Sequence, residues 1–141
     1  MSNNWSIEKA REHFNIVPNK STTVEKTKRK NEESQMQKKC VKLFNQLYPL
    51  YILFSIPNGG NRNEIEAVNL KKEGVVSGVA DLCLLFGNGG YFALFIEMKT
   101  SKGKQSETQI AFQKYCEKNK YKYVVCRSVE EFMNEVNNYL N

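Results

Sequence analysis

The sequence predicts an α/β fold in which helices cover both faces of a mixed sheet. Two apolar runs, 79–86 and 91–100, are joined by GNGG, a turn signal that indicates a hairpin. Both runs are apolar at almost every position, so we expect them at the centre of the sheet, covered on each side. Patterns of helical and strand periodicity flank the hairpin. The predicted order is helix, strand, helix, two strands, helix, strand, helix.

Composition places the chain among ordinary globular proteins. Its 141 residues are 40% hydrophobic and 26% charged, which suits one domain with one core. No apolar run approaches the about 20 residues that span a bilayer. The first residues carry no apolar signal segment. We therefore predict a cytoplasmic protein with no membrane partner.

The cysteines and the histidine limit the metal chemistry. The four cysteines (Cys40, Cys83, Cys116 and Cys126) form no C-x-x-C pair and stand among apolar residues. We expect reduced, buried thiols. With His13 as the one histidine, we expect no structural zinc site. Any metal would be a hard cation held by carboxylates.

Residues 1–31 are predicted to form a basic arm or linker ahead of a domain over 32–141. The arm holds seven Lys/Arg and three Glu, and so carries +4 of the net charge of +6. A short helix is expected over 6–14, and Pro18 marks a linker. The run KTKRK is interpreted first as a solvated helix face; a phosphate-contacting arm and an extension packed on another subunit stay open. The basic excess favours an anionic partner.

The domain opens with a helix from about Glu32 to Tyr48, which Pro49 ends. Its core-facing stripe consists of Met36, Cys40, Leu43, Phe44 and Leu47. Glu33 lies at the N-terminal end of the side that faces the core. Two interpretations of Glu33 stay open: it complements the helix dipole, or it reaches a functional site.

A strand over 50–57 and a loop, NGGNRN, follow this helix. The next helix spans 64–73, with Ile65, Val68 and Leu70 as its apolar residues, and stops at Gly74. After the hairpin, Ser106 and Gln109 form a capping box that starts a helix. The expected buried stripe of that helix consists of Ile110, Phe112, Tyr115 and Cys116. A strand over 121–126 and a last helix, capped by Ser128 and running to about Leu140, complete the chain.

Three charged residues interrupt the two central apolar runs. Asp81 stands near the start of the first run, and Glu97 and Lys99 stand on one face near the end of the second. Buried charges are rare unless they are paired or bind a metal. Two carboxylates suffice for Mg²⁺ when a substrate phosphate supplies further oxygens. Lys99 can then hold the attacking water, stabilise charge or act as a base, which predicts phosphodiester hydrolysis.

Each of these residues also has a structural interpretation. Asp81 can be a turn or strand-start residue. Glu97 and Lys99 can form a single ion pair at a strand end. Gln109 can serve the capping box alone. The combination of all of them, in this order, favours the nuclease.

Five segments together resemble one family. They are ESQMQ at 33–37, IPNGGNRN at 56–63, KKEGVVSGVAD at 71–81, FIEMK at 95–99 and GKQSETQ at 103–109. In this order they resemble the virus-type replication-repair nuclease (VRR-NUC) family of the PD-(D/E)xK nucleases. The resemblance covers about 32–132 and implies a restriction-endonuclease-like sandwich. The family pattern commonly has proline before the aspartate, where this chain has Ala80; since proline is no ligand there, we expect activity to survive.

The resemblance also implies a role for each matching position. Asp81 and Glu97 bind the metal, and Lys99 is the lysine of the motif. Beside these matches, we expect the backbone carbonyl of Met98 to join the metal ligands. Glu33 is the helix carboxylate, acting directly or through water, and Gln109 lines the site. Phosphate contacts are expected from basic residues around the mouth, namely Arg62, Lys71, Lys72, Lys102 and Lys104.

The family further implies Mg²⁺ or Mn²⁺ as the cofactor, no organic cofactor, and a homodimer that cuts branched DNA such as four-way junctions. The setting would be a bacterial or phage-infected cell. Two other classes stay open. One is a non-catalytic nucleic-acid-binding or assembly protein on the same fold. The other is an α/β interaction module in which the carboxylates do not cluster.

Overall fold

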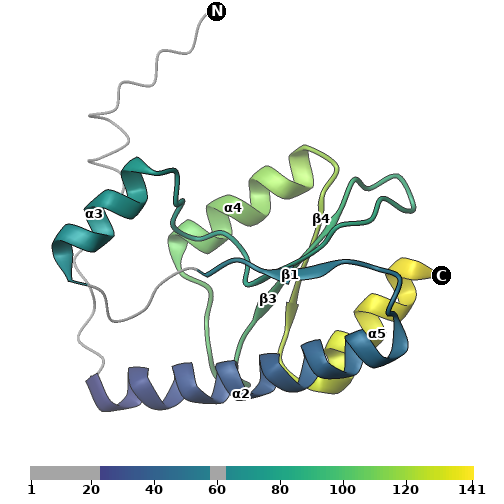
Figure 1. Ribbon diagram of the computed structural model, residues 1–141, viewed down its shortest axis with the longest axis horizontal. Helices are drawn as coiled ribbons and strands as arrows, with labels where there is room; N and C mark the ends of the chain where they lie inside the picture. The colour runs from purple at the N-terminus through teal and green to yellow at the C-terminus, as the bar shows by residue number, and fades with distance from the viewer. Residues whose placement is uncertain (1–22, 58–62) are drawn as a thin grey trace, which may run out of the picture.

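The helices and strands follow the predicted order. The computed structural model describes residues 23–57 and 63–141, and all statements on structure concern these residues. In chain order the elements are α2 (Thr23–Leu47), β1 (Leu53–Ser55), α3 (Glu64–Lys72), β2 (Leu82–Leu84), β3 (Leu94–Met98), α4 (Glu107–Lys118), β4 (Lys122–Cys126) and α5 (Val129–Leu140). Helices α2 and α5 lie on one side of the sheet and α4 lies on the other (Figure 1).

The sheet is mixed, and the predicted hairpin lies at its centre. Its strand order is β1-β2-β3-β4. Strand β2 is antiparallel to both of its neighbours, whereas β3 and β4 run parallel. At the tip of the hairpin Asn88 pairs with Tyr91, and Gly89 and Gly90 have φ of 59° and 84°. Positive φ at both central residues is the geometry that the GNGG signal predicts.

Each face of the sheet has its own apolar cluster. The larger cluster joins strand residues such as Leu84 and Ile96 to Phe44 of α2 and Phe132 of α5, all fully buried. The smaller cluster joins Ala80, Cys116 and Tyr123 beneath α4. The cysteines are free and buried, as predicted. Burial raises the pKa of their thiols to about 11 for Cys40, Cys83 and Cys116 and to about 12 for Cys126.

Helix α2 begins earlier than predicted. The pattern starts the helix near Glu32, but it begins at Thr23. No Pro or Gly interrupts 23–47, so the charged KTKRK run simply extends the helix as an exposed face. This favours the solvated-face interpretation of the run. The division between an arm over 1–31 and a domain over 32–141 stays a prediction.

Two of the predicted apolar stripes are partly wrong. Leu47 of α2 is 57% exposed, and Tyr115 of α4 is 62% exposed. Helix α3 buries none of its residues, and Ile65 is 76% exposed. Helix α3 stands at the side of the molecule, away from the sheet, so its apolar residues join neither apolar cluster of the described chain (Figure 1). Its stop is as predicted, because Gly74 has φ 105° and closes the helix.

Some predictions concern residues outside the described chain. These are the short helix over 6–14, the linker at Pro18, and the loop that contains Arg62. Within the described residues, no helix is both long enough and apolar enough to cross a membrane.

Candidate active site

The two carboxylates that interrupt the apolar runs face each other across the central hairpin. Strands β2 and β3 pair Leu82 with Ile96. Continuing this antiparallel register by one residue places Asp81 opposite Glu97. Directly opposed residues on neighbouring strands have Cβ atoms about 4.5–5.5 Å apart. The site therefore lies where β2 begins and β3 ends, at one end of the sheet.

Glu97 is the buried charged residue of the described chain, with 2% of its surface exposed. Its Oε1 accepts a hydrogen bond of 2.7 Å from Nε2 of Gln109 and lies 3.6 Å from Nζ of Lys99. Its Oε2 is buried and receives no hydrogen bond from the described residues. An ionised oxygen without a partner in such a place is costly. The oxygen therefore needs either a proton or a cation.

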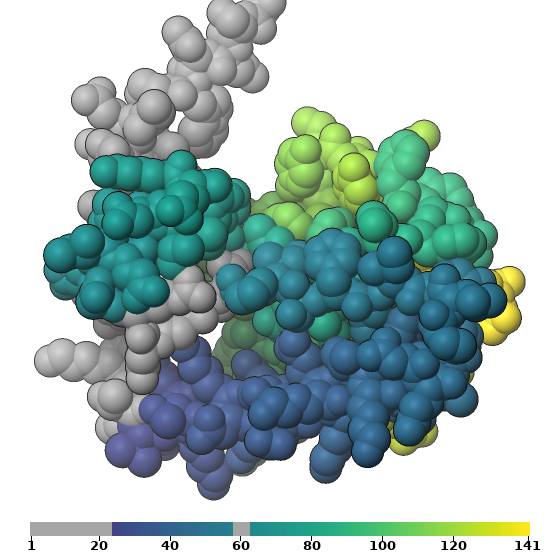
Figure 2. Space-filling model, in the orientation of Figure 1, coloured from purple at the N-terminus to yellow at the C-terminus, as the bar shows by residue number. Residues whose placement is uncertain are grey.

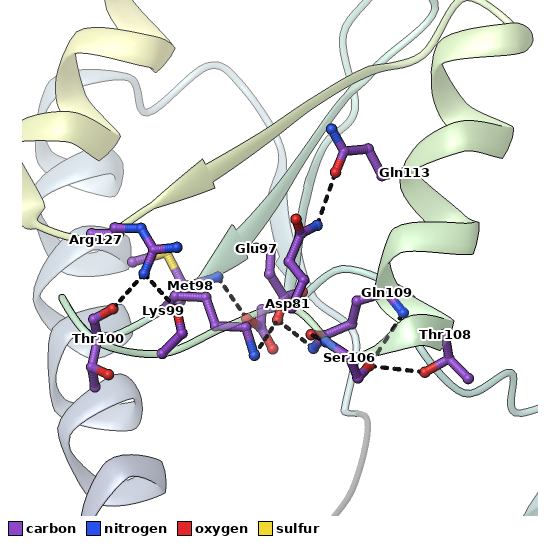
Figure 3. A network of polar contacts seen from close by, with 12 residues as sticks. Asp81, Glu97, Met98, Lys99, Thr100, Ser106, Thr108, Gln109, Gln113 and Arg127 are labelled. Carbon is purple, nitrogen blue, oxygen red and sulfur yellow. Dashed lines mark hydrogen bonds and ion pairs between the residues drawn. The ribbon is translucent and has the colours of Figure 1, made fainter. Parts of the chain in front are cut away.

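Asp81 and Lys99 complete the centre (Figure 3). Oδ2 of Asp81 accepts a hydrogen bond of 2.7 Å from the backbone N–H of Met98. The side chain of Lys99 is 12% exposed and lies on the same face of β3 as Glu97. Met98, between them in the chain, points into the larger apolar cluster.

Burial raises the pKa values of both facing carboxyl groups. Burial, followed by the charge of Asp81, raises the pKa of Glu97 to about 8, against the opposing charge of Lys99. Burial also raises the pKa of Asp81, although the N–H of Met98 and the charge of Lys99 lower it. Burial therefore disfavours the ionised form of both carboxyl groups when no cation is bound. Paired carboxyl groups with raised pKa values are typical of functional sites.

Glu33 reaches the same region from α2. Burial raises its pKa, while the charge of Lys99 and a hydrogen bond from the backbone of Thr100 lower it. Glu33 and Asp81 line one groove of about 670 Å³ between α2 and the segment of β1. Figure 2 shows the surface hollowed between the purple-to-blue helix and the blue strand. Both acidic residues are therefore accessible from this groove, which we call the site groove.

Gln109 both caps α4 and contacts the acidic centre, so the two interpretations of this residue hold together. Its Oε1 accepts from the backbone N–H of Ser106 at 2.8 Å and completes the predicted capping box. Its Nε2 donates to Glu97. Gly78 brings the start of α4 close enough for this bond. It has φ 86°, and a Cβ there would lie 2.4 Å from the backbone of Thr108.

Arg127 is a positioning residue that the sequence reasoning missed. Its Nη1 donates to the carbonyl oxygens of Thr100 and Gly103, both at 2.7 Å. These bonds fix the loop that follows Lys99. The position of Arg127 could have been inferred from the sequence, because parallel strands end at the same edge of a sheet. Met98 pairs with Cys126, so Arg127 begins beside Lys99.

The predicted phosphate-contacting residues do not gather in one place. Lys71 and Lys72 lie in the last turn of α3, away from the sheet. Lys102 and Lys104 are exposed in the loop after β3, and Arg62 lies outside the described residues. The site groove is instead lined by Lys30, Lys38 and Lys42 of α2, which the sequence reasoning left out.

The centre fits a hard cation held by two carboxylates. In the described part of the chain no group of three or more His, Cys, Asp or Glu side chains is arranged to hold a metal. Asp81 and Glu97 nevertheless present adjacent carboxylates, one with an unpartnered buried oxygen. Two carboxylates are an adequate set for Mg²⁺, which keeps several waters.

Comparison with known proteins gives the family. The profile of the VRR-NUC domain matches residues 23–130, starting where α2 starts. The chain belongs to the VRR-NUC family. This is a nuclease-type family.

A solved VRR-NUC domain protein has a similar structure. It is 21% identical in sequence and superposes with a TM-score of 0.66 over 77% of this chain and 87% of its own. The likeness shows that the two proteins share an α/β fold. Among curated protein sequences none matches significantly.

Proposed function

We propose that this VRR-NUC protein is a divalent-metal-dependent endodeoxyribonuclease with a restriction-endonuclease-like PD-(D/E)xK core. The observation that carries the proposal is the buried Glu97 carboxyl. It faces Asp81, lies 3.6 Å from Lys99 and has one oxygen without a partner in the described chain. An ion pair with Lys99 accounts for Oε1 of Glu97 but not for Oε2. This argues against the α/β interaction module, whose carboxylates would not cluster.

Each residue of the centre has a role in this proposal. Asp81 and Glu97 would hold Mg²⁺ or Mn²⁺, together with the backbone carbonyl of Met98. A bound divalent cation neutralises charge on the scissile phosphate and makes a water more acidic. Lys99 orients that water, and Gln109 fixes the Glu97 carboxyl through its hydrogen bond of 2.7 Å. Glu33 acts through water from the wall of the site groove.

The finer parts of the proposal come from the family resemblance. They are a preference for branched DNA such as four-way junctions, a homodimer, a role in DNA repair, and action in the cytoplasm of a bacterial or phage-infected cell. Lys102 and Lys104, exposed beside the site, are proposed to contact the arms of such a substrate, as are Arg62, Lys71 and Lys72. Sedimentation at several concentrations tests the dimer independently of cleavage.

A cleavage assay tests the activity. Junctions, flaps, nicked duplex and plain duplex are incubated with Mg²⁺, Mn²⁺ or EDTA. We expect products only with metal and fastest on a branched substrate. The variant Asp81→Ala should bind but not cut; if it cut as fast as the parent, the site assignment would be wrong. Binding without cleavage under every condition would favour the alternative, a non-catalytic nucleic-acid-binding protein on this fold.

A further inference from the structure

We propose that one strand of the nucleic acid lies along α2 in the site groove and is held by a row of lysines, Lys30, Lys38 and Lys42. This inference rests on the proposed function, since it assigns the path of the substrate through that same site. It places the main phosphate contacts on α2 rather than on α3 or the loop after β3.

The groove joins the lysine row directly to the acidic centre. Lys30, Lys38 and Lys42 line it from α2, and Asp81 and Glu33 lie within it. Lys30 lies on one side of Glu33 along the helix, and Lys38 and Lys42 lie on the other. Phosphates on both sides of the scissile bond are therefore held by cations, while the acids stand at the point of cleavage.

The three lysines are available to an external anion. All three are exposed, and none forms an ion pair with a carboxylate of the described chain. From Lys30 to Lys42 the row rises by twelve helical steps, or about 18 Å at about 1.5 Å per residue. At about 3.4 Å of rise per nucleotide this matches roughly five nucleotides of one strand.

The opposite wall suits the other side of a nucleotide strand. It is formed by Leu53, Ser55, Ile56 and Pro57, which end β1 and follow it. Lysines face apolar side chains across the groove, so a strand can place its phosphates on α2 and its sugars and bases on the β1 wall. A polyanion with apolar rings has this two-sided character.

Helix α2 supplies its own control, because its other side is also basic. A second groove between α2 and the start of α5 is lined by Lys28, Lys39, Gln35 and Val129, with no residue of the acidic centre. Non-specific attraction would use both sides of the helix. The proposed path uses one side.

The first experiment compares two double variants, Lys38→Gln/Lys42→Gln and Lys28→Gln/Lys39→Gln. Each removes two charges from α2, and glutamine keeps the helix. Binding to labelled single strands, duplexes and junctions is measured in EDTA over a range of salt. The variant Lys38→Gln/Lys42→Gln should weaken binding at least about tenfold and flatten the slope of log K against log salt by about 1.4 to 1.8. The control variant, Lys28→Gln/Lys39→Gln, should change the affinity and the salt slope by much less.

The second experiment locates the strand. Because the native cysteines are buried, a surface cysteine can be labelled selectively with an iron chelate that cuts DNA nearby. Ser34→Cys places the chelate in the site groove, and Gln35→Cys places it in the other groove. Without Mg²⁺, we expect tethered cutting from Ser34→Cys and little from Gln35→Cys.

The outcomes distinguish a failure of the proposed strand path from a failure of the proposed nuclease activity. Equal effects of the two double variants, or stronger cutting from Gln35→Cys, would overturn the strand path even if the parent cleaves DNA with metal. Asymmetric binding and cutting by a protein that never cleaves in any metal would support the path and overturn the proposed activity.

Discussion

The two faces of the sheet are built for different purposes. On the α2 and α5 face, Leu82, Ile96 and Met98 are fully buried among apolar side chains. On the α4 face the neighbour of Met98 is Glu97, almost as deeply buried but with an oxygen that no described residue satisfies. One face lowers the free energy of folding by removing apolar surface from water. The other leaves a buried carboxyl oxygen without a partner in the described chain, which raises the free energy of folding and supports the proposed metal site.

This contrast predicts that damage to the two faces has opposite signatures. Variants of the apolar face should lose stability and keep activity per folded molecule. Variants of the charged centre should lose activity and keep, or even gain, stability.

The largest effect is expected from Glu97→Gln. It removes the charge that would hold the cation, so cleavage should fall at least about 1,000-fold, equivalent to about 4 kcal/mol. Single-turnover cleavage measures the loss, and urea unfolding should show no destabilisation. Glu135→Gln is the control, because Glu135 belongs to an exposed pair with Lys122 at 3.9 Å. Comparable losses in both variants would contradict the distinction between the two faces.

Phe132→Ala should have the opposite signature. Phe132 of α5 is fully buried in the larger cluster. Truncation of a core phenylalanine costs about 3–5 kcal/mol. Urea unfolding measures the loss, while cleavage per folded molecule at low temperature should stay near that of the parent. Phe112→Ala on the α4 side, where Phe112 is only partly buried, should cost less.

Gly78→Ala should damage both properties at once. A Cβ would meet the backbone of Thr108 at 2.4 Å, and φ of 86° strains any other residue. We expect a cost of about 2–4 kcal/mol, with displacement of Gln109 and slower cleavage. Gly74→Ala is the control. It has φ 105° but nothing within 4 Å, so only the backbone cost of about 1–2 kcal/mol applies and cleavage should persist. Equal costs would show that the close approach at Gly78 is unimportant.

The element order, the central hairpin and the capping box could be predicted because each depends on local pattern. Register could not. At the tip Asn88 pairs with Tyr91, whereas within the sheet Leu84 pairs with Leu94. The β2 side therefore carries one extra residue, a bulge. If the pairing seen at the tip continued along both strands, Asp81 would lie opposite Met98, whose side chain is on the other face of the sheet. The shift of one residue places Glu97 opposite Asp81 instead.

The lining of the site groove could not be predicted from the sequence either. Lys30, Lys38 and Lys42 stand in a helix that is basic on several sides, and nothing in their spacing distinguishes them from Lys28 or Lys39. Only the packing of α2 beside β1 selects one side. The exposure of Ile65 on α3 could not be predicted for the same reason, because periodicity gives a face but not a neighbour to cover it.

The smallest effect is the pH dependence of the metal-free protein. The pKa of Glu97 is about 8 in the folded chain against an ordinary 4.5. Between these values folding takes up a proton, so this stabilisation is complete below pH 4.5 and is lost as pH rises through about 8. The slope is at most about 1.4 kcal/mol per pH unit for one proton. Burial raises the pKa of Asp81 and of Glu33 in the same direction.

Urea unfolding in EDTA between pH 6 and 8 measures this slope, and the native thiols stay protonated throughout that range. The parent should lose about 2 kcal/mol across it, and Glu97→Gln should lose much less, since its amide has no proton to release. A flat profile for the parent would show that Glu97 is already ionised. Because a cation needs the ionised carboxylate, adding Mg²⁺ or Mn²⁺ at pH 7 should release a proton from the parent and not from Glu97→Gln.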